Sequence, residues 1–327
     1  QWISEGRPTP VAEQRGKVIP MDIHDEYVTF LRGYLSDLSG IRVAFDLSDG
    51  MSCLFAREIF GDSHSYIFDE IDGTFPNHEP NPLIHKNVEP LEALVRETGA
   101  DVGVIYDGDA DRVMFVDDEG HFVSPDLIIA VLGKYFVEKR GEKGLVLQDI
   151  RSSKSVGEFL EPMGIRMQTW KVGRAFAARK LREIDGIWGG ELAGHYYFRD
   201  FFYSDSGMLA SILVLGIVAS LKAEGKTFSG LIRSISHYRN SGEINFRIED
   251  KAGAMEALKD YFTSLEKPTA FMDFDGYRIE FEKWWFNVRP SNTEPYLRFI
   301  CEAATDELLG EKTNAARQLL SDKFGAK

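Results

Sequence analysis

The sequence predicts a protein of the α/β class, in which two α/β units precede a small α+β domain. Over most of the chain, short apolar patterns typical of strands alternate with helical patterns, which indicates parallel sheets covered by helices. After residue 242 the strand patterns follow one another more closely, and helices stand at the ends. A chain of 327 residues also exceeds what one hydrophobic core usually supports, so several compact units are expected.

The first unit is predicted at 21–119, after a tail or linker at 1–20 that is rich in glycine and proline. Hydrophobic periodicity predicts its elements in this order: a helix at 25–38, a strand at 41–46, a helix at 51–60, a strand at 66–68, a helix at 91–98, and strands at 102–106 and 113–116. The loop at 72–82 is dense in proline and asparagine and is too long for a plain connection. It indicates either a function or irregular packing.

The second unit is predicted at 120–236 and again alternates strands with helices. Its expected helices lie at 125–138, 153–160, 173–184, 205–221 and 228–234, and its strands at 145–148, 167–170 and 187–190. The apolar run at 207–221 is shorter than a bilayer span, so it is expected to be a buried helix and no membrane segment is predicted.

The third unit, at 237–327, is expected to be the α+β domain. Its predicted strands lie at 243–248, 277–281, 284–288 and 296–302, and its helices at 252–265 and 306–324.

The net charge of −14 argues against a nucleic-acid partner, because such a partner requires a basic face. An anionic ligand would have to be attracted by a local basic site, against the field of the whole chain. Cys53 and Cys301 are far apart and lack metal-ligand spacing. With no signal sequence visible at the start, a reducing cytoplasm is the expected location.

The most informative stretch is Asp107-Gly108-Asp109-Ala110-Asp111-Arg112, which lies between two apolar strand patterns. Carboxylates at every second position of a short loop can turn their oxygens toward one point, and a hard cation such as Mg²⁺ is held by such oxygens. A solvated acidic turn is the plain alternative. A calcium-binding EF-hand is excluded, because its loop needs glycine sixth and a bidentate acid twelfth, where this chain has Arg112 and Asp118.

Two further loops contain polar groups that could bind a ligand, one suited to hydroxyl groups and the other to an anion. In Gly190-Glu191-Leu192-Ala193-Gly194-His195, Glu191 could accept hydrogen bonds from hydroxyl groups and His195 could exchange a proton, although a tight turn is an equal alternative. In Arg289-Pro290-Ser291-Asn292-Thr293-Glu294-Pro295, an arginine, two hydroxyls and an amide are suited to bind phosphate. A polar turn is the alternative for this loop.

Cations also open two predicted helices. Arg151 and Lys154 lie at the start of one helix, and Arg174 opens the next. Helix N-termini favour anions, so cations there are more intelligible beside a bound phosphate. Solvated surface charges are the alternative.

Taken together, these motifs resemble those of the α-D-phosphohexomutase family, whose members move phosphate between C1 and C6 of a hexose. Asp107–Arg112 resembles the family's D-G-D-G-D-R loop, with Ala110 in place of glycine. Gly190–His195 resembles its sugar-binding G-E-M-S-G-H, 289–295 its phosphate-binding R-P-S-N-T-x-P, and 72–82 its D-G-x-F-P-N-H-x-P-N-P. The segments at 196–208 and 241–245 are most similar to the bacterial phosphomannomutase branch.

The resemblance implies a fold of four domains, of which 21–119, 120–236 and 237–327 would be the second, third and fourth. The last would be a TATA-binding-protein-like α+β domain. It also implies Mg²⁺ as cofactor, held by Asp107, Asp109 and Asp111, and mannose or glucose phosphates as ligands. The remaining implied roles place Arg112 and Arg151 beside the transferring phosphate, Arg174, Glu191 and His195 at the sugar, and Arg289, Ser291, Asn292 and Thr293 at the other phosphate.

The sequence departs from the family in two ways. No T-A-S-H-N-P stretch is present to supply the family's phosphoserine, and Ser63-His64 lacks the surroundings of that motif. Ala193 replaces a residue whose hydroxyl would touch the sugar. The expectation is a mutase chain without its serine-bearing domain, inactive alone, with 1–20 as the tail of that domain. A non-catalytic sugar-phosphate-binding or regulatory relative is the alternative, and an unrelated Mg²⁺-dependent phosphatase is a weaker one because no nucleophile can be placed.

Overall fold

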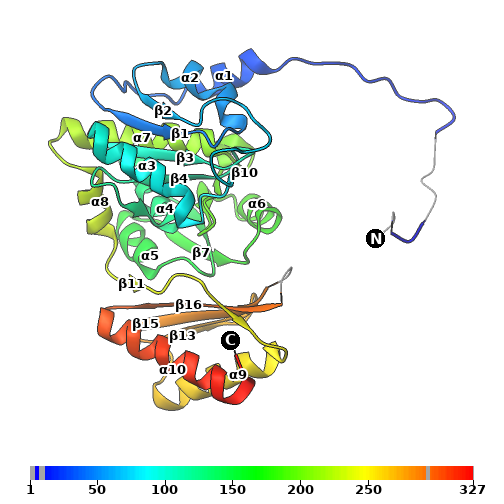
Figure 1. The fold of residues 1–327 in the computed structure, drawn as a ribbon, viewed down its shortest axis with the longest axis vertical. Helices are drawn as coiled ribbons and strands as arrows, with labels where there is room; N and C mark the ends of the chain where they lie inside the picture. The colour runs from blue at the N-terminus through cyan, green and yellow to red at the C-terminus, as the bar shows by residue number, and fades with distance from the viewer. Residues whose placement is uncertain (1–3, 7–11, 292–294, 327) are drawn as a thin grey trace.

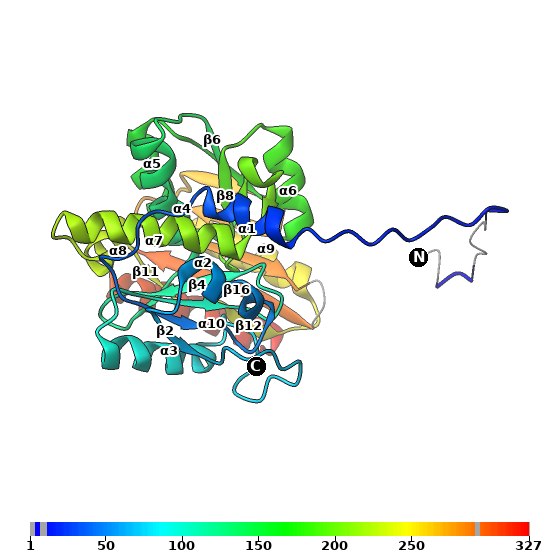
Figure 2. The same cartoon turned by 90° about the horizontal axis from the view of Figure 1, so that it is seen from above.

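The computed structural model describes residues 4–6, 12–291 and 295–326. Three sheets, each with its own helices, are stacked along the long axis of the molecule (Figure 1). The segment at 12–23 is exposed and leads away from the body before helix α1 begins (Figures 1 and 2). The expectation of two α/β units followed by a small α+β domain is confirmed.

The first sheet has the strand order β2-β1-β3-β4-β5, with β1, β2 and β3 parallel and the last two strands antiparallel. Alternate side chains of its strands pack on helix α3 on one face and on α2 and α7 on the other. The elements are α1 (His24–Arg32), β1 (Val43–Asp46), η1 (Met51–Leu54), α2 (Ala56–Phe60), β2 (Ser65–Ile67), α3 (His85–Thr98), β3 (Val102–Tyr106), β4 (Val113–Val116) and β5 (Phe122–Val123).

The second sheet has the order β10-β9-β8-β6-β7, with β6, β7 and β8 parallel. Helices α4 and α5 cover one face and α6 the other. The elements are α4 (Pro125–Gly133), the π-helical η2 (Lys134–Lys139), β6 (Leu145–Asp149), α5 (Lys154–Leu160), β7 (Arg166–Trp170), α6 (Arg174–Glu183), β8 (Trp188–Gly190), β9 (Tyr196–Phe198), β10 (Ser204–Asp205), α7 (Gly207–Ala223) and α8 (Phe228–Ile235).

Helix α7 joins the first two units into one body. Its apolar side chains are buried nearly all round, and it contacts β3 and β4 of the first sheet as well as α4 of the second. One continuous hydrophobic core therefore runs from the first sheet to the second. This arrangement brings the loops that follow β3 and β8 close to each other, which matters for the site described below.

The third sheet is antiparallel, with the order β11-β16-β15-β14-β13 and β12 also paired with β16. Its own core lies between the sheet and two helices. The elements are β11 (Arg239–Asn240), β12 (Ile244–Arg247), α9 (Lys251–Leu265), β13 (Ala270–Met272), β14 (Tyr277–Glu280), β15 (Trp284–Pro290), β16 (Tyr296–Ala303) and α10 (Asp306–Phe324).

Several predicted elements have different limits in the structure. The helix expected at 25–38 ends at Arg32, the one at 51–60 divides into η1 and α2, and the one at 125–138 becomes π-helical at Lys134. The helix expected from 91 begins at His85, so that Pro90 lies inside it, past the first turn, where proline cannot donate the usual backbone hydrogen bond. Strands of two or three residues, such as β5 and β11, are too short to show a periodic pattern.

Among the described residues, no single helix is long and apolar enough to cross a bilayer. Helices α7 and α8 reach that length only when taken together, and they are bent by 105° relative to each other.

Candidate active site

The candidate site lies where parallel strands of the first two sheets end. Asp107 follows β3, Arg151 follows β6, and Glu191 follows β8. Ligands of open α/β sheets bind beyond the carboxyl ends of the strands, because loops from neighbouring strands converge there. Strand order thus explains why motifs separated by tens of residues meet in space.

The acidic loop after β3 gathers three carboxylates. Asp107, Asp109 and Asp111 each offer an oxygen, and these oxygens lie within 4.8 Å of one another. Burial raises the pKa of Asp107 to about 6, although the guanidinium of Arg112 lies 2.7 Å from its Oδ2 atom. Burial also raises the pKa of Asp111. Three crowded carboxylates, two of them with raised pKa, are a donor set that fits a hard divalent cation.

The loop at 72–82 packs against the acidic loop. Asn77 Nδ2 donates to both carboxylate oxygens of Asp49, at 3.1 and 2.9 Å, and His78 Nε2 lies 3.1 Å from Oδ2 of Asp46. The Gly108 backbone lies close to Pro80, since a Cβ atom at Gly108 would come within 3.3 Å of that ring. The long loop is therefore ordered by two buried aspartates, to which sequence reasoning assigned no role.

At Gly50, the loop after β1 approaches the backbone of the acidic loop. A Cβ atom at Gly50 would lie 2.6 Å from the carbonyl oxygen of Gly108. The backbone N–H of Met51 donates to that same oxygen at 3.0 Å. Glycine at position 50 therefore permits a backbone approach that helps to fix the acidic loop.

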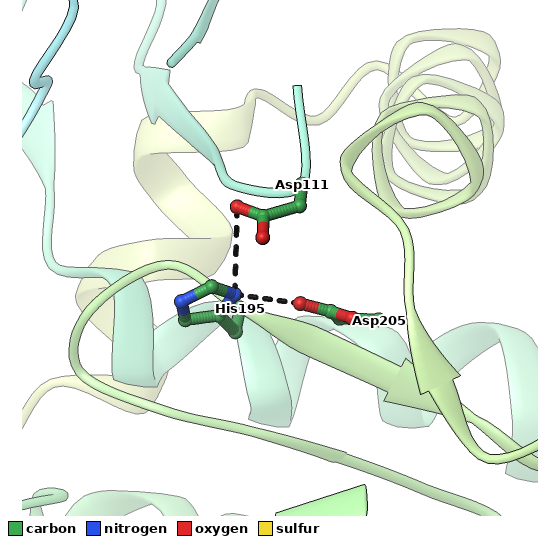
Figure 3. A group of neighbouring side chains, drawn as sticks. All are labelled: Asp111, His195 and Asp205. Carbon is green, nitrogen blue, oxygen red and sulfur yellow. Dashed lines mark hydrogen bonds and ion pairs between the residues drawn. The ribbon is translucent and has the colours of Figure 1, made fainter. Parts of the chain in front are cut away.

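A second group joins the acidic loop to the second sheet (Figure 3). The Nδ1 atom of His195 lies 2.8 Å from Oδ2 of Asp205 and 3.8 Å from Oδ1 of Asp111. Arg174 Nε donates to Asp205 at 2.7 Å and lies 3.7 Å from Asp111. Residues Arg112 and His195 also form a β-bridge. The sequence pattern places Asp205 only at the start of a helix, whereas in the structure it anchors two predicted site residues.

Glu191 is buried beside this group. Its Oε1 atom accepts a hydrogen bond from the backbone N–H of Gly173 at 2.8 Å. Burial, and then the charge of Asp149, raise the pKa of Glu191 to about 7. The glycine before it is required by packing, because a Cβ atom at Gly190 would come within 2.7 Å of Ile129. A carboxyl group with this pKa can accept hydrogen bonds near neutral pH and, when protonated, can also donate one.

Two arginines from different sheets meet at the other end of the site. Arg151 is buried, with Nη2 2.7 Å from Oδ2 of Asp149 and Nη1 3.7 Å from Glu243. Arg289 is also buried, and its pKa is lowered by burial and then by the neighbouring charge of Arg151. The Nε atom of Arg289 has no hydrogen-bond partner within the described part of the chain. Two neighbouring buried arginines, one with an Nε–H group that lacks an acceptor among the described residues, could bind an anion.

Polar contacts connect the two ends. Asp149, which pairs with Arg151, also accepts the backbone N–H of Leu192 at 2.9 Å, next to Glu191. Glu191 in turn contacts the loop that precedes Arg174. Asp275 accepts the backbone N–H of Val172 at 2.8 Å and lies 4.0 Å from Nη1 of Arg289. Most of the predicted site residues therefore lie along one connected set of contacts that runs from the acidic loop to Arg289. Ser291 is described at the end of β15, whereas Asn292 and Thr293 lie outside the described residues.

Three family models match the chain in order. They are phosphoglucomutase/phosphomannomutase alpha/beta/alpha domain II at residues 25–120, domain III at 124–238, and the C-terminal domain at 243–317. Among curated proteins, the phosphomannomutase of Methanocaldococcus jannaschii is 33% identical over 93% of this chain and 66% of its own length. The phosphomannomutase of Salmonella typhimurium is 34% identical over 95% of this chain and 70% of its own length. The chain thus spans about two thirds of the length of these relatives.

Solved structures share the fold. A phosphoglucomutase/phosphomannomutase family protein from Burkholderia thailandensis matches with a TM-score of 0.81 and 25% identity, over 92% of this chain and 64% of that one. N-acetylphosphoglucosamine mutase from Aspergillus fumigatus, solved with GlcNAc-6P and magnesium, matches with a TM-score of 0.64 and 15% identity, over 90% of this chain and 65% of that one. The three consecutive domain models, together with the 34% identity to the Salmonella typhimurium protein over 95% of this chain, show that the chain belongs to the α-D-phosphohexomutase family of phosphoglucomutases and phosphomannomutases.

Proposed function

We propose that this chain is the cation- and sugar-phosphate-binding part of a phosphohexomutase that interconverts mannose 6-phosphate and mannose 1-phosphate, with glucose phosphates as possible further substrates. The reaction would pass through a phosphoserine and a 1,6-bisphosphate. The observation that carries the proposal is the connected line of charged groups from Asp111, through His195 and Glu191, to Arg151 and Arg289. It has an acidic end suited to a cation and a basic end suited to a phosphate.

Asp107, Asp109 and Asp111 would hold Mg²⁺. The support is the convergence of their oxygens within 4.8 Å and the magnesium named for the Aspergillus fumigatus relative. When bound, the ion would supply positive charge beside the transferring phosphate. Arg112, hydrogen-bonded to Asp107 at 2.7 Å, would add a second positive charge at the same place. Crowded carboxylates would also become less repulsive once the cation is present.

The remaining groups would orient the substrate. Glu191, His195 and Arg174 would bind the sugar hydroxyls. His195 and Arg174 lie 3.8 and 3.7 Å from Asp111 of the acidic loop, and Glu191 belongs to the same loop as His195. Arg289 and Ser291, followed by Asn292 and Thr293, would bind the phosphate that does not react. Arg151 would neutralise the phosphate in transfer. Phosphoryl transfer depends mainly on such positioning and charge neutralisation, so no further acid or base is needed from these residues to explain their arrangement.

Turnover would need a serine that these 327 residues do not supply, since no T-A-S-H-N-P stretch occurs among them. We therefore expect this polypeptide alone to bind mannose 1-phosphate but not to convert it, even with added hexose 1,6-bisphosphate.

The proposal is tested by calorimetric titration of mannose 1-phosphate into the chain. We expect binding that weakens about tenfold or more in R289M, as expected for the loss of a charge-assisted contact. Arg239→Met is the matched control, because Arg239 pairs with Asp306 on the exposed surface of the same domain. Equal affinities for wild type, R289M and R239M would contradict the assignment of Arg289. Steady mutase turnover by the polypeptide alone would contradict the expected inactivity.

A further inference from the structure

Arg278 reaches from the C-terminal domain into the loop that carries Arg151. It lies in β14 and is almost fully buried, with 2% of its surface exposed. Its Nη1 atom donates to the backbone carbonyl oxygen of Ile150 at 2.8 Å and to that of Ser152 at 2.6 Å. These two residues stand on either side of Arg151. The guanidinium of one domain therefore holds both neighbours of a candidate site residue in another.

The surroundings of Arg278 fix its guanidinium in place. Its central carbon lies 3.8 Å from the centre of the Trp285 ring, and its Nε atom donates to Glu280 at 2.7 Å. Trp285 in turn donates from Nε1 to Glu302 at 2.6 Å. That carboxylate also accepts the backbone N–H of Lys154, at 3.2 Å. The C-terminal domain thus grips the loop at 150–154 at both its ends.

The contacts between the C-terminal domain and the loop at 150–154 form despite electrostatic repulsion between two buried arginines. Arg151 and Arg289 lie close enough to repel each other, and both are largely removed from water. Asp149 offsets part of this repulsion, but it belongs to the same strand end as Arg151 and moves with it. The contacts from Arg278 to the backbone on both sides of Arg151, together with the 3.7 Å pair between Arg151 and Glu243, tie the position of Arg151 to the domain that carries Arg289.

We propose that Arg278 is a positioning residue: by holding the carbonyl groups that flank Arg151, it makes the presentation of Arg151 to a phosphate depend on docking of the C-terminal domain. The assignment of a phosphate to Arg151 rests on the proposed function. The mechanical link between Arg278 and the loop rests only on the contacts described above. A phosphate bound by Arg151 strengthens the docking in return, because coupling between two sites is reciprocal.

The test compares R278M and R278K with wild type in the whole chain. Hydrogen exchange is followed in peptides that cover 149–154 and in peptides from β15 and β16, and inorganic phosphate and mannose 1-phosphate are titrated separately. In R278M we expect exchange at 149–154 to rise about tenfold while β15 and β16 stay protected, and phosphate affinity to fall about tenfold. R278K keeps a charged donor, so its exchange rate at 149–154 and its phosphate affinity should lie between those of wild type and R278M. Arg239→Met, in the same domain but on its surface, should match wild type.

A folded R278M with unchanged exchange at 149–154 would overturn the proposal. Loss of protection throughout β15 and β16 that R278K does not restore would also overturn it, because Arg278 would then only support the core of its own domain. If wild type binds neither phosphate nor mannose 1-phosphate, the proposed function fails, whereas the exchange comparison still decides whether Arg278 positions the loop.

Discussion

Nδ1 of His195 lies 2.8 Å from Oδ2 of Asp205, whose side chain is fully buried. The same carboxylate accepts a hydrogen bond from Arg174 Nε at 2.7 Å. Although burial alone would raise it, the pKa of Asp205 is lowered, because His195 and Arg174 both stabilise the charged form. Asp205 therefore holds two candidate sugar-binding residues, His195 and Arg174, next to the acidic loop, and both of them hydrogen-bond its charged carboxylate.

Asp205→Asn should lower the free energy of unfolding at pH 7 by about 2–3 kcal/mol, because Arg174 and His195 lose the buried carboxylate that accepts their hydrogen bonds. A carboxyl with a lowered pKa stabilises the fold above its ordinary pKa, 3.8, and loses this contribution as pH falls through the folded value. The difference between D205N and wild type should therefore shrink below about pH 4. Urea unfolding from pH 3 to pH 8 measures it.

Asp306→Asn serves as the control for this prediction. Asp306 pairs with Arg239 at 3.3 Å, but both side chains are exposed. Such a pair contributes about 0–1 kcal/mol, so D306N should stay close to wild type at every pH. If D205N and D306N behave alike, Asp205 is not the anchor described here.

Local pattern predicted the strands that carry the site better than it predicted the contacts between them. The alternation of strands and helices, and the carboxylates of 107–111, depend on periodicity and spacing that one segment contains by itself. Asp205 and Arg278 act through partners more than thirty residues away in sequence, Arg174 and Ile150. Such pairs depend on how distant elements and separate domains pack together, which no single segment specifies.

The position of Ala110 shows a further limit. A substitution of alanine for the family's glycine is visible in the sequence. Its consequence is visible only in the backbone, where Ala110 has φ 61°. The long loop at 72–82 is similar: its length indicated a function or irregular packing, and the structure adds the partners, Asp46 and Asp49, that order it.

Removing one carboxylate from the acidic loop should weaken divalent cation binding. For Asp109→Asn we expect the affinity for Mn²⁺, used as a spectroscopic substitute for Mg²⁺, to fall about 10-fold to 100-fold, since a charged ligand contributes roughly 1.5–3 kcal/mol. Electron paramagnetic resonance of free Mn²⁺ during titration measures the affinity.

A second acidic group in the same unit provides the control. Asp117, Glu119 and His121 also lie close enough together to hold an ion, but Glu119 is exposed and paired with Arg233 at 2.8 Å. Glu119→Gln should leave Mn²⁺ affinity unchanged. Equal losses in D109N and E119Q would show that the ion binds to the general negative charge and not to the loop.

Glu191 should make the stability of the protein depend on pH in the opposite sense from Asp205. Its pKa is raised from 4.5 to about 7, so its contribution is fully present below pH 4.5 and is lost as pH rises through 7. That loss is roughly 3 kcal/mol for a shift of this size. Glu191→Gln removes the titration, so the stability of the variant relative to wild type should increase between pH 5 and pH 8. Chemical unfolding without added metal measures this difference.

Glu311→Gln is the matched control for that series. Glu311 lies in α10 with an exposed side chain beside Lys312. Its replacement should change stability by the same small amount at pH 5 and pH 8. A variant E191Q whose difference from wild type is also constant with pH would contradict a pKa near 7 for Glu191.

Ala110 places a Cβ atom in a left-handed backbone conformation, with φ 61°, inside the acidic loop. This conformation costs a residue other than glycine roughly 1–2 kcal/mol, and glycine recovers it at an entropic cost of about 0.5–1 kcal/mol. Ala110→Gly should therefore raise the free energy of unfolding by about 0.5–1 kcal/mol. Ala257→Gly, in the helix α9, should lower it by about 1 kcal/mol. Urea unfolding of both variants measures whether the free energy of unfolding rises or falls. If A110G lowers it as much as A257G does, the loop is not strained at residue 110.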